Sequence, residues 1–175
     1  MNKINQVPLL LQRAEREWKA IYPELPVADA ALIGQLIGAG ANADRVGLEN
    51  LKPYDLRQTE HDVLACAMRQ GQPFKVTPSK LLEEVRITSG ALTTCLNRLI
   101  DRDLIVRLAA DKDQRSKPIQ LTQKGFSVIE SVTQQRFQLA GEVMAGFSKD
   151  EKLMLNKLLS KFQHNLLETV ETGSQ

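Results

Sequence analysis

The chain has 175 residues, of which 42% are hydrophobic and 25% charged, and its formal net charge is +2. This length allows a buried core and favours one domain, and the composition is that of neither a disordered nor a membrane protein. No apolar run reaches the roughly 18 residues of a membrane-spanning helix, and the N-terminus lacks a secretion signal, so we expect a cytoplasmic protein that does not enter a membrane.

Two helices are predicted in the N-terminal part. Apolar residues recur at helical spacing over residues 9–22, and Pro23 and Pro26 then interrupt the pattern. A second helical run follows over residues 27–51, although its glycines weaken the case for an unbroken helix. Pro53 separates this run from the middle of the chain.

A third helix is expected to begin near Gln58 or Thr59, because Thr59 and Asp62 have the spacing of a capping box. Gly71 and Pro73 are residues that end a helix. Four apolar residues at helical spacing form its predicted buried face: Val63, Leu64, Ala67 and Met68.

Two more helices follow, separated by only a few residues. Thr77 before Pro78 marks the start of one, and Thr88 or Ser89 is expected to cap the next. The apolar residues expected to face the core are Leu81, Leu82, Val85, Leu92, Leu96, Leu99 and Ile100, with Ile87 in the turn.

A hairpin is predicted next, from strands over residues 104–109 and 117–121 with a polar tip over residues 110–116. Thr122 is expected to cap a long helix, and residues 148–151 form a capping box before a final helix. Helix, tight turn, helix and basic hairpin is the order of a winged helix-turn-helix, which reads duplex DNA. The predicted fold class is therefore mainly α, with a small β-hairpin wing.

The two ends of the chain carry more apolar surface than one small winged-helix core needs, as Trp18 and Leu158 illustrate. We expect residues 1–52 and 126–175 to form dimerisation helices and residues 53–125 to form the DNA-binding lobe. The alternative is one extended monomeric core.

The helix that starts at Ser89 is expected to enter the major groove, because its leucines face inward and leave a polar face. Small residues at its start allow close approach to DNA, and its N-terminal amides favour a phosphate. Threonine hydroxyls and methyls suit base edges, and the asparagine suits adenine or a phosphate. The face consists of Ser89, Gly90, Ala91, Thr93, Thr94, Asn97 and Arg98. Taken alone, the pattern fits an ordinary amphipathic helix with a solvated face better than a DNA-reading helix.

The hairpin tip strengthens the prediction of DNA binding. Arg115, steadied by Asp113, is placed to enter a minor groove, while Lys112 and Lys117 would contact phosphates. The alternative is a solvated turn.

The run from Asp113 to Gly125 resembles the wing signature of the MarR family, an Asp-x-Arg leading into a strand that ends Leu-Thr-x-x-Gly. Residues 77–81, 89–99 and 104–106 contain further motifs in register with that family, and the resemblance covers residues 9–167. It implies a dimeric winged-helix repressor or activator on a pseudo-palindromic operator, commonly relieved by a small ligand.

Within that family the chain is similar to the urate-responsive subgroup. The resemblance implies a ligand pocket with Trp18, Asp62 and Arg107, whereas Cys95 occupies the position of a second arginine. A thiol cannot hold an anion as a guanidinium does, so the pocket but not urate is predicted. The alternative is that Trp18 belongs to the dimer core and that Arg107 is a surface charge.

The remaining chemistry-bearing residues predict neither a metal site nor catalysis. Cys66 and Cys95 form no CxxC pair, and His61 and His164 have no second ligand at helical spacing. Sensing cysteines of the resembled family lie mostly in the N-terminal helix, so we expect these two to act as small buried hydrophobes. No catalytic motif is present, and neither an enzyme nor a cofactor is predicted.

The sequence thus predicts a homodimeric DNA-binding transcription regulator, a repressor that binds a palindrome-like operator in double-stranded DNA. A small aromatic or anionic effector is expected to bind between the dimer helices and the DNA-binding lobes and to change the spacing of the two reading helices. The alternative is a protein-interaction module whose winged helix docks a partner protein, as an antirepressor would.

Overall fold

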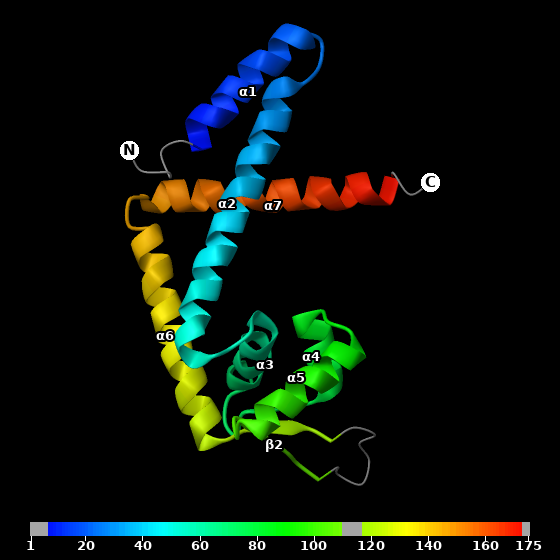
Figure 1. Ribbon diagram of the computed structural model, residues 1–175, viewed down its shortest axis with the longest axis vertical. Coiled ribbons are helices and arrows are strands. Elements are labelled where there is room, and N and C mark those ends of the chain that lie inside the picture. The colour runs from blue at the N-terminus through cyan, green and yellow to red at the C-terminus, as the bar shows by residue number, and fades with distance from the viewer. Residues whose placement is uncertain (1–6, 110–116, 173–175) are drawn as a thin grey trace. The chain divides into compact units, whose positions relative to one another are not determined.

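The computed structural model describes residues 7–109 and 117–172. It is mainly helical with a small three-stranded antiparallel sheet, which confirms the predicted fold class (Figure 1). The chain divides into two units, Met1–Thr133 and Gln134–Gln175. In the part of the chain that the structure describes, no helix combines the length and the apolar character that crossing a membrane requires.

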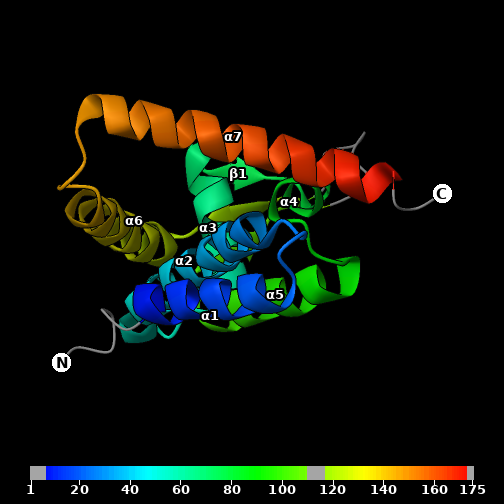
Figure 2. The ribbon, with the colours of Figure 1, turned by 90° about the horizontal axis from the view of Figure 1, so that it is seen from above.

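Helices α1 (Val7–Ile21) and α2 (Val27–Leu51) run antiparallel and lie side by side (Figure 1, Figure 2). The turn between them contains Pro23 and Pro26, as the sequence predicted. Each glycine weakens a helix by only about 1 kcal/mol. Helix α2 therefore continues through its glycines for 25 residues and passes into the short 3-10 helix η2 (Lys52–Tyr54).

Helix α3 (Gln58–Arg69) begins where predicted, but the predicted capping box at Thr59 is wrong. The N-cap is Arg57, whose backbone N–H donates to Oε2 of Glu60 at 2.9 Å. Asp62 instead accepts a hydrogen bond from the side chain of the first helical residue at 2.8 Å. A glutamate at the third helical position reaches back to the N-cap whatever residue stands there, and this pair therefore sets the helix start.

Helices α4 (Pro78–Val85) and α5 (Ser89–Asp101) form the predicted helix–turn–helix with α3. Thr77 caps α4 and Thr88 caps α5, each hydroxyl accepting from the backbone N–H three residues on, at 3.4 and 3.2 Å. Both caps confirm predictions made from the sequence.

Strands β2 (Ile105–Arg107) and β3 (Ile119–Leu121) form the predicted hairpin, shorter than expected, with Arg107 opposite Ile119. A third strand, β1 (Lys75–Val76), pairs with β3 and gives the order β1-β3-β2. The sequence prediction of only two strands was wrong, because two residues are too few to show an alternating pattern.

Helices α6 (Gln123–Val143) and α7 (Lys149–Thr172) complete the chain. Thr122 caps α6, since its Oγ1 accepts from the backbone N–H three residues on at 2.9 Å. Ser148 and Glu151 form the predicted reciprocal capping box before α7, with hydrogen bonds of 2.8 and 3.2 Å.

The start of α6 lies directly against the start of the hairpin. Thr122 N–H donates to the Leu104 carbonyl at 3.1 Å. A Cβ on Gly125 would collide with that same carbonyl, so the first turn of α6 reaches the hairpin only because residue 125 has no side chain.

Most residues of the hydrophobic core lie in the winged-helix lobe. The core contains the residues predicted for α3, α4 and α5, with Leu82, Val85, Met68 and Ile100 at its partly buried margin. It extends beyond residues 53–125, because Leu51 of α2 and Ile129 and Val132 of α6 are completely or almost completely buried in it. The ends of α2 and α6 nearest the lobe therefore belong to its core.

Candidate nucleic-acid interface

Helix α5 presents the predicted polar face to solvent. Leu92, Leu96 and Leu99 are buried beneath it. The exposed residues are Ser89, Gly90, Ala91, Thr93, Thr94 and Asn97, whereas Arg98 is partly buried. A duplex that approaches this face would meet small side chains first.

The two threonine hydroxyls of this face are oriented by the helix itself. Thr93 Oγ1 donates to the Ser89 carbonyl at 2.9 Å, and Thr94 Oγ1 donates to the Gly90 carbonyl at 3.1 Å. Because each hydroxyl has used its only proton, it keeps lone pairs alone for a partner outside the helix. The face therefore offers hydrogen-bond acceptors and methyl groups at these positions.

Asn97 is joined to the hairpin. Nη2 of Arg107, on β2, donates to Asn97 Oδ1 at 3.1 Å, and both residues are exposed. This bond uses one lone pair of the asparagine carbonyl oxygen, and the NH2 group of Asn97 supplies donors. This contact places Arg107, which the sequence associated with a ligand, beside the face of α5.

Arg98 points toward the protein. Its Nε lies 2.7 Å from Oε1 of Glu60, a residue whose side chain is only 1% exposed. From the sequence, Arg98 was expected to contact DNA, whereas Glu60 had no expected role. The salt bridge joins α3 to α5 across the core, and no local pattern in the sequence reports such a pairing.

The wing is only partly described. Lys112, Asp113 and Arg115 lie outside the described residues, so their roles stay predictions. Lys117 is exposed at the base of the hairpin, where the Leu108 N–H donates to the Pro118 carbonyl at 2.8 Å.

The turn between α4 and α5 carries a basic residue that the sequence analysis did not single out. Arg86 is exposed and has a left-handed φ of 55° at the C-cap of α4. It stands three residues before the first residue of α5. A lysine or arginine in the turn of a helix–turn–helix was the available signal for a phosphate contact.

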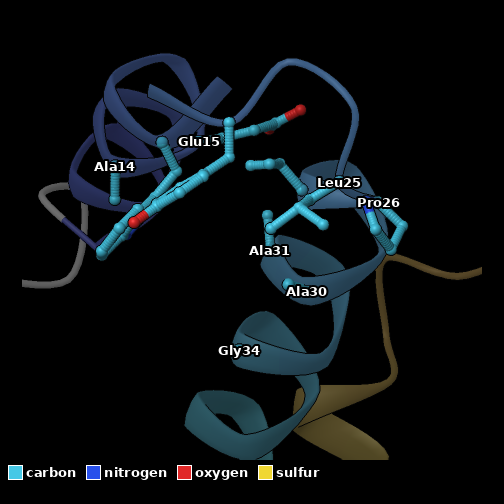
Figure 3. Close-up of a pocket in the computed structure, with 10 residues that line it drawn as sticks. Ala14, Glu15, Leu25, Pro26, Ala30, Ala31 and Gly34 are labelled. Atoms are coloured by element: carbon cyan, nitrogen blue, oxygen red, sulfur yellow. The ribbon is translucent and has the colours of Figure 1, made fainter. Parts of the chain in front are cut away.

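Of the three residues predicted to bind a ligand, Trp18 lines a cavity whose lining includes neither Asp62 nor Arg107. Trp18 stacks on Tyr22, with ring centroids 5.9 Å apart, and lines a cavity of about 490 Å³ between α1 and the start of α2 (Figure 3). Asp62 accepts a hydrogen bond from Gln58 and lies 2.9 Å from His61 Nδ1, while Arg107 contacts Asn97. The cavity is lined by Ala14, Glu15, Trp18, Tyr22, Leu25, Pro26, Val27, Ala30, Ala31 and Gly34.

Both cysteines are buried inside the lobe, as predicted. Burial raises the pKa of the Cys66 thiol to about 11, helped by its hydrogen bond to Glu84 Oε2 at 3.2 Å. Burial, with the nearby Glu60 carboxylate, likewise raises the pKa of Cys95 to about 11. Within residues 7–109 and 117–172, no group of three His, Cys, Asp or Glu side chains has metal-site geometry.

Comparison with known proteins gives a consistent result. A family model described as MarR family matches residues 56–117. The chain is 30% identical over 152 residues to the HTH-type transcriptional regulator PecS of Dickeya dadantii (strain 3937), covering 87% of this chain and 92% of that relative.

Solved structures agree. A mutant MarR from E. coli complexed with operator DNA is similar with a TM-score of 0.62 and 28% identity, over 83% of this chain and 96% of that one. A MarR family protein from Bacillus stearothermophilus has a TM-score of 0.64, with 80% of this chain and 96% of that one covered, and at 23% identity it supports the fold alone.

Proposed function

The chain belongs to the MarR family of DNA-binding transcription regulators, and we propose that it acts as a homodimeric repressor whose DNA affinity is modulated by a small ligand. The observation that carries this proposal is the exposed face of α5, held by a buried core on a complete helix–turn–helix. A gel shift with duplex DNA from upstream of its own gene tests DNA binding. A reporter gene on the same DNA, whose expression rises when the regulator is removed, tests repression.

Base reading is assigned to the exposed face of α5 in a major groove. Thr93 and Thr94, which offer only acceptors and methyl groups, fit the amino groups of adenine or cytosine and the methyl group of thymine. Asn97 keeps an NH2 donor, which fits acceptors such as guanine O6 or thymine O4. Ser89, Gly90 and Ala91 allow the backbone to approach closely.

Phosphate contacts are assigned to basic residues around this face. Lys117 and Arg86 are exposed at the hairpin base and in the helix–turn–helix turn. From the sequence pattern, Lys112 and Arg115 of the wing are added to these phosphate contacts, with Asp113 steadying Arg115.

The substitution Arg115→Ala tests the role of the wing. Its duplex affinity should fall and the salt dependence of binding should become shallower; an unchanged affinity and slope would remove the wing from the mechanism.

A symmetric homodimer is supported by apolar side chains that the single chain leaves in solvent. Trp18 and Ile33 on the N-terminal helices and Phe137, Leu158 and Leu167 near the C-terminus are all more than one-third exposed. Two copies related by a two-fold axis would bury such faces and place two α5 helices in successive major grooves, about 34 Å apart.

The effector is proposed to be a small aromatic compound, and two places compete for it. The residues that line the cavity beside Trp18 include one carboxylate, Glu15, and no lysine or arginine, which favours a neutral flat ring over an anion. Asp62 and Arg107 form the second candidate, from the sequence pattern. An anion on Arg107 would compete with Asn97 Oδ1 and so disturb the reading face directly.

Thermal shift screening separates the two effector sites. If a neutral aromatic compound stabilises the parent chain but not Trp18→Ala, the cavity is supported as the effector site. If an aromatic acid stabilises the parent chain but not Arg107→Ala, the second place is supported.

The rival function is a module that docks a partner protein through the same α5 face. This function is favoured if the folded chain binds no duplex DNA, its own upstream region included, at any salt concentration.

A further inference from the structure

A buried carboxylate lies behind the DNA-facing helix. Glu60 of α3 is 1% exposed, and its two oxygens face two arginines of the α5 segment. Oε1 lies 2.7 Å from Arg98 Nε, and Oε2 lies 3.7 Å from Arg102 Nη1. Oε2 also accepts the Arg57 backbone N–H at 2.9 Å. Glu60 thus supplies the side chain that accepts the N-cap N–H of α3, and it is also the counter-ion of the α5 arginines.

The second arginine, Arg102, also binds two backbone carbonyls at the end of η2. Arg102 donates to the Asp55 carbonyl at 2.6 Å and to the Tyr54 carbonyl at 2.7 Å, at the end of η2. Its side chain is 28% exposed, and that of Arg98 is 33% exposed. Removing Glu60's charge would therefore free Arg98, while Arg102 would keep its two carbonyl partners.

The orientation of Arg98 decides whether its guanidinium can reach a DNA phosphate from α5. It is the single lysine or arginine in Ser89–Asp101, and it follows Thr94 by one helical turn on the same side of the helix. A free guanidinium there would reach along the exposed face toward a phosphate. Paired with Glu60, it is withdrawn instead, and the face consists of hydroxyl, methyl and amide groups.

We propose that Glu60 is a positioning residue that withholds Arg98 from the DNA backbone, so that α5 reads bases while adding little sequence-independent attraction. This inference rests on the proposed role of α5 in DNA reading. Sequence-independent affinity comes from neutralised phosphates, and each added phosphate contact steepens the salt dependence of binding by about one unit of logarithmic slope. Glu60 therefore raises the ratio of specific to non-specific affinity, because it lowers the non-specific affinity.

The substitution that tests this is Glu60→Gln. Glutamine also serves as the third residue of a capping box, so the start of α3 is preserved while the charge is removed. Asp101→Asn is the matched control, because it removes one negative charge from α5 at an exposed residue without an ion pair within the described residues. The probe is a duplex of unrelated sequence, about two helical turns long, titrated with the full chain at several salt concentrations.

The expected result for Glu60→Gln is a slope steeper by about one, equal to about a fourfold greater loss of affinity between 50 and 200 mM salt than for the parent. Non-specific affinity at low salt should rise several-fold, while Asp101→Asn leaves the slope unchanged. The double variant Glu60→Gln/Arg98→Met should return the slope to that of the parent. A slope in Glu60→Gln equal to that of the parent overturns the inference.

Folding of Glu60→Gln is checked first by circular dichroism. If Glu60→Gln does not fold, the salt slope of the double variant tests the inference instead. The double variant is expected to fold because it replaces the charge pair by neutral groups of similar size. A parental slope then supports the inference, and a slope shallower by about one shows that Arg98 already contacts DNA and overturns it. Failure of the parent chain to bind any duplex is a different outcome, and it overturns the proposed function.

Discussion

The two threonines in the middle of α5 illustrate how an exposed side chain acquires a defined hydrogen-bonding role. Each hydroxyl rotates freely in isolation and both donates and accepts. In the helix, bonds of 2.9 and 3.1 Å to carbonyls one turn earlier use the proton of Thr93 and of Thr94. A donor–acceptor group thereby becomes an acceptor, which narrows the set of base edges it fits.

Thr93→Val is the test of this acceptor. The change keeps the branched shape and removes the hydroxyl, whose proton bonds only within its own helix turn. In selection from a random duplex pool, preference at one base position per half-site should weaken by about fivefold, corresponding to a hydrogen bond of about 1 kcal/mol. Non-specific affinity should stay unchanged; an equal loss for every sequence would indicate a phosphate contact instead.

The buried thiols give a pH prediction with a definite sign. The pKa of Cys66 and of Cys95 rises to about 11 in the fold from an ordinary value of 9.0. The folded state therefore holds these protons more tightly, and the stability they contribute is complete below pH 9.0 and lost as the pH rises toward 11. Urea unfolding between these pH values should show a steeper decline for the parent than for a variant with both cysteines changed to alanine.

The same burial predicts insensitivity to oxidants. A thiol with a pKa of about 11 is almost entirely protonated at neutral pH, and the thiolate is the reactive form. Peroxide treatment should therefore leave duplex affinity unchanged. A reversible loss of affinity that disappears in Cys95→Ser would contradict this.

At the scale of elements, the first turn of α6 packs against the hairpin with no room for a side chain at residue 125. Gly125→Ala should destabilise the lobe by about 2 kcal/mol, because a methyl group would overlap the Leu104 carbonyl and force the backbone apart. Gly141→Ala in the same helix is the control, since a Cβ there meets nothing within 4 Å. It should leave stability unchanged or raise it by up to about 1 kcal/mol. Chemical denaturation measures both, and equal effects would refute the packing argument.

Elements that depend on local chemistry were predictable from the sequence. Thr77, Thr88, Thr122 and Ser148 each cap the helix expected of them, because a hydroxyl N-cap satisfies an amide two or three residues on. The start of α3 was located correctly with the wrong cap, since Arg57 lacks the usual N-cap side chain. Strand β1 was missed because its pairing with β3 is a tertiary interaction.

At the scale of the molecule, the exposed apolar residues of the terminal helices are the reason that a homodimer is predicted. Leu158 of α7 is a large apolar side chain that is 56% exposed. Sedimentation equilibrium should show a dimer for the parent, and Leu158→Glu should raise the dimer dissociation constant at least tenfold without unfolding the lobe. Gln163→Glu adds the same charge at another exposed position of α7 and should leave the dimer intact. A monomeric parent would exclude the symmetric assembly.

For the candidate site on α5, the sequence predicted which residues are exposed but not how the charged residues pair. Amphipathic spacing indicated which residues of α5 face outward, since it depends only on helical geometry. The pairing of Arg98 with Glu60 and the contact of Arg107 with Asn97 join residues from different elements. Only folding brings them together, so periodicity alone treats Arg98 as free and leaves Glu60 without a role.

The internal hydrogen bonds of Thr93 and Thr94 also bear on how such a regulator diverges. These hydroxyls bond within their own helix, so replacing them disturbs no other element of the lobe. After gene duplication, a copy is therefore free to drift at the outward positions while selection for folding retains the leucines beneath them. Under the base reading proposed for α5, single substitutions at these two positions would give new operator preferences while the fold is kept.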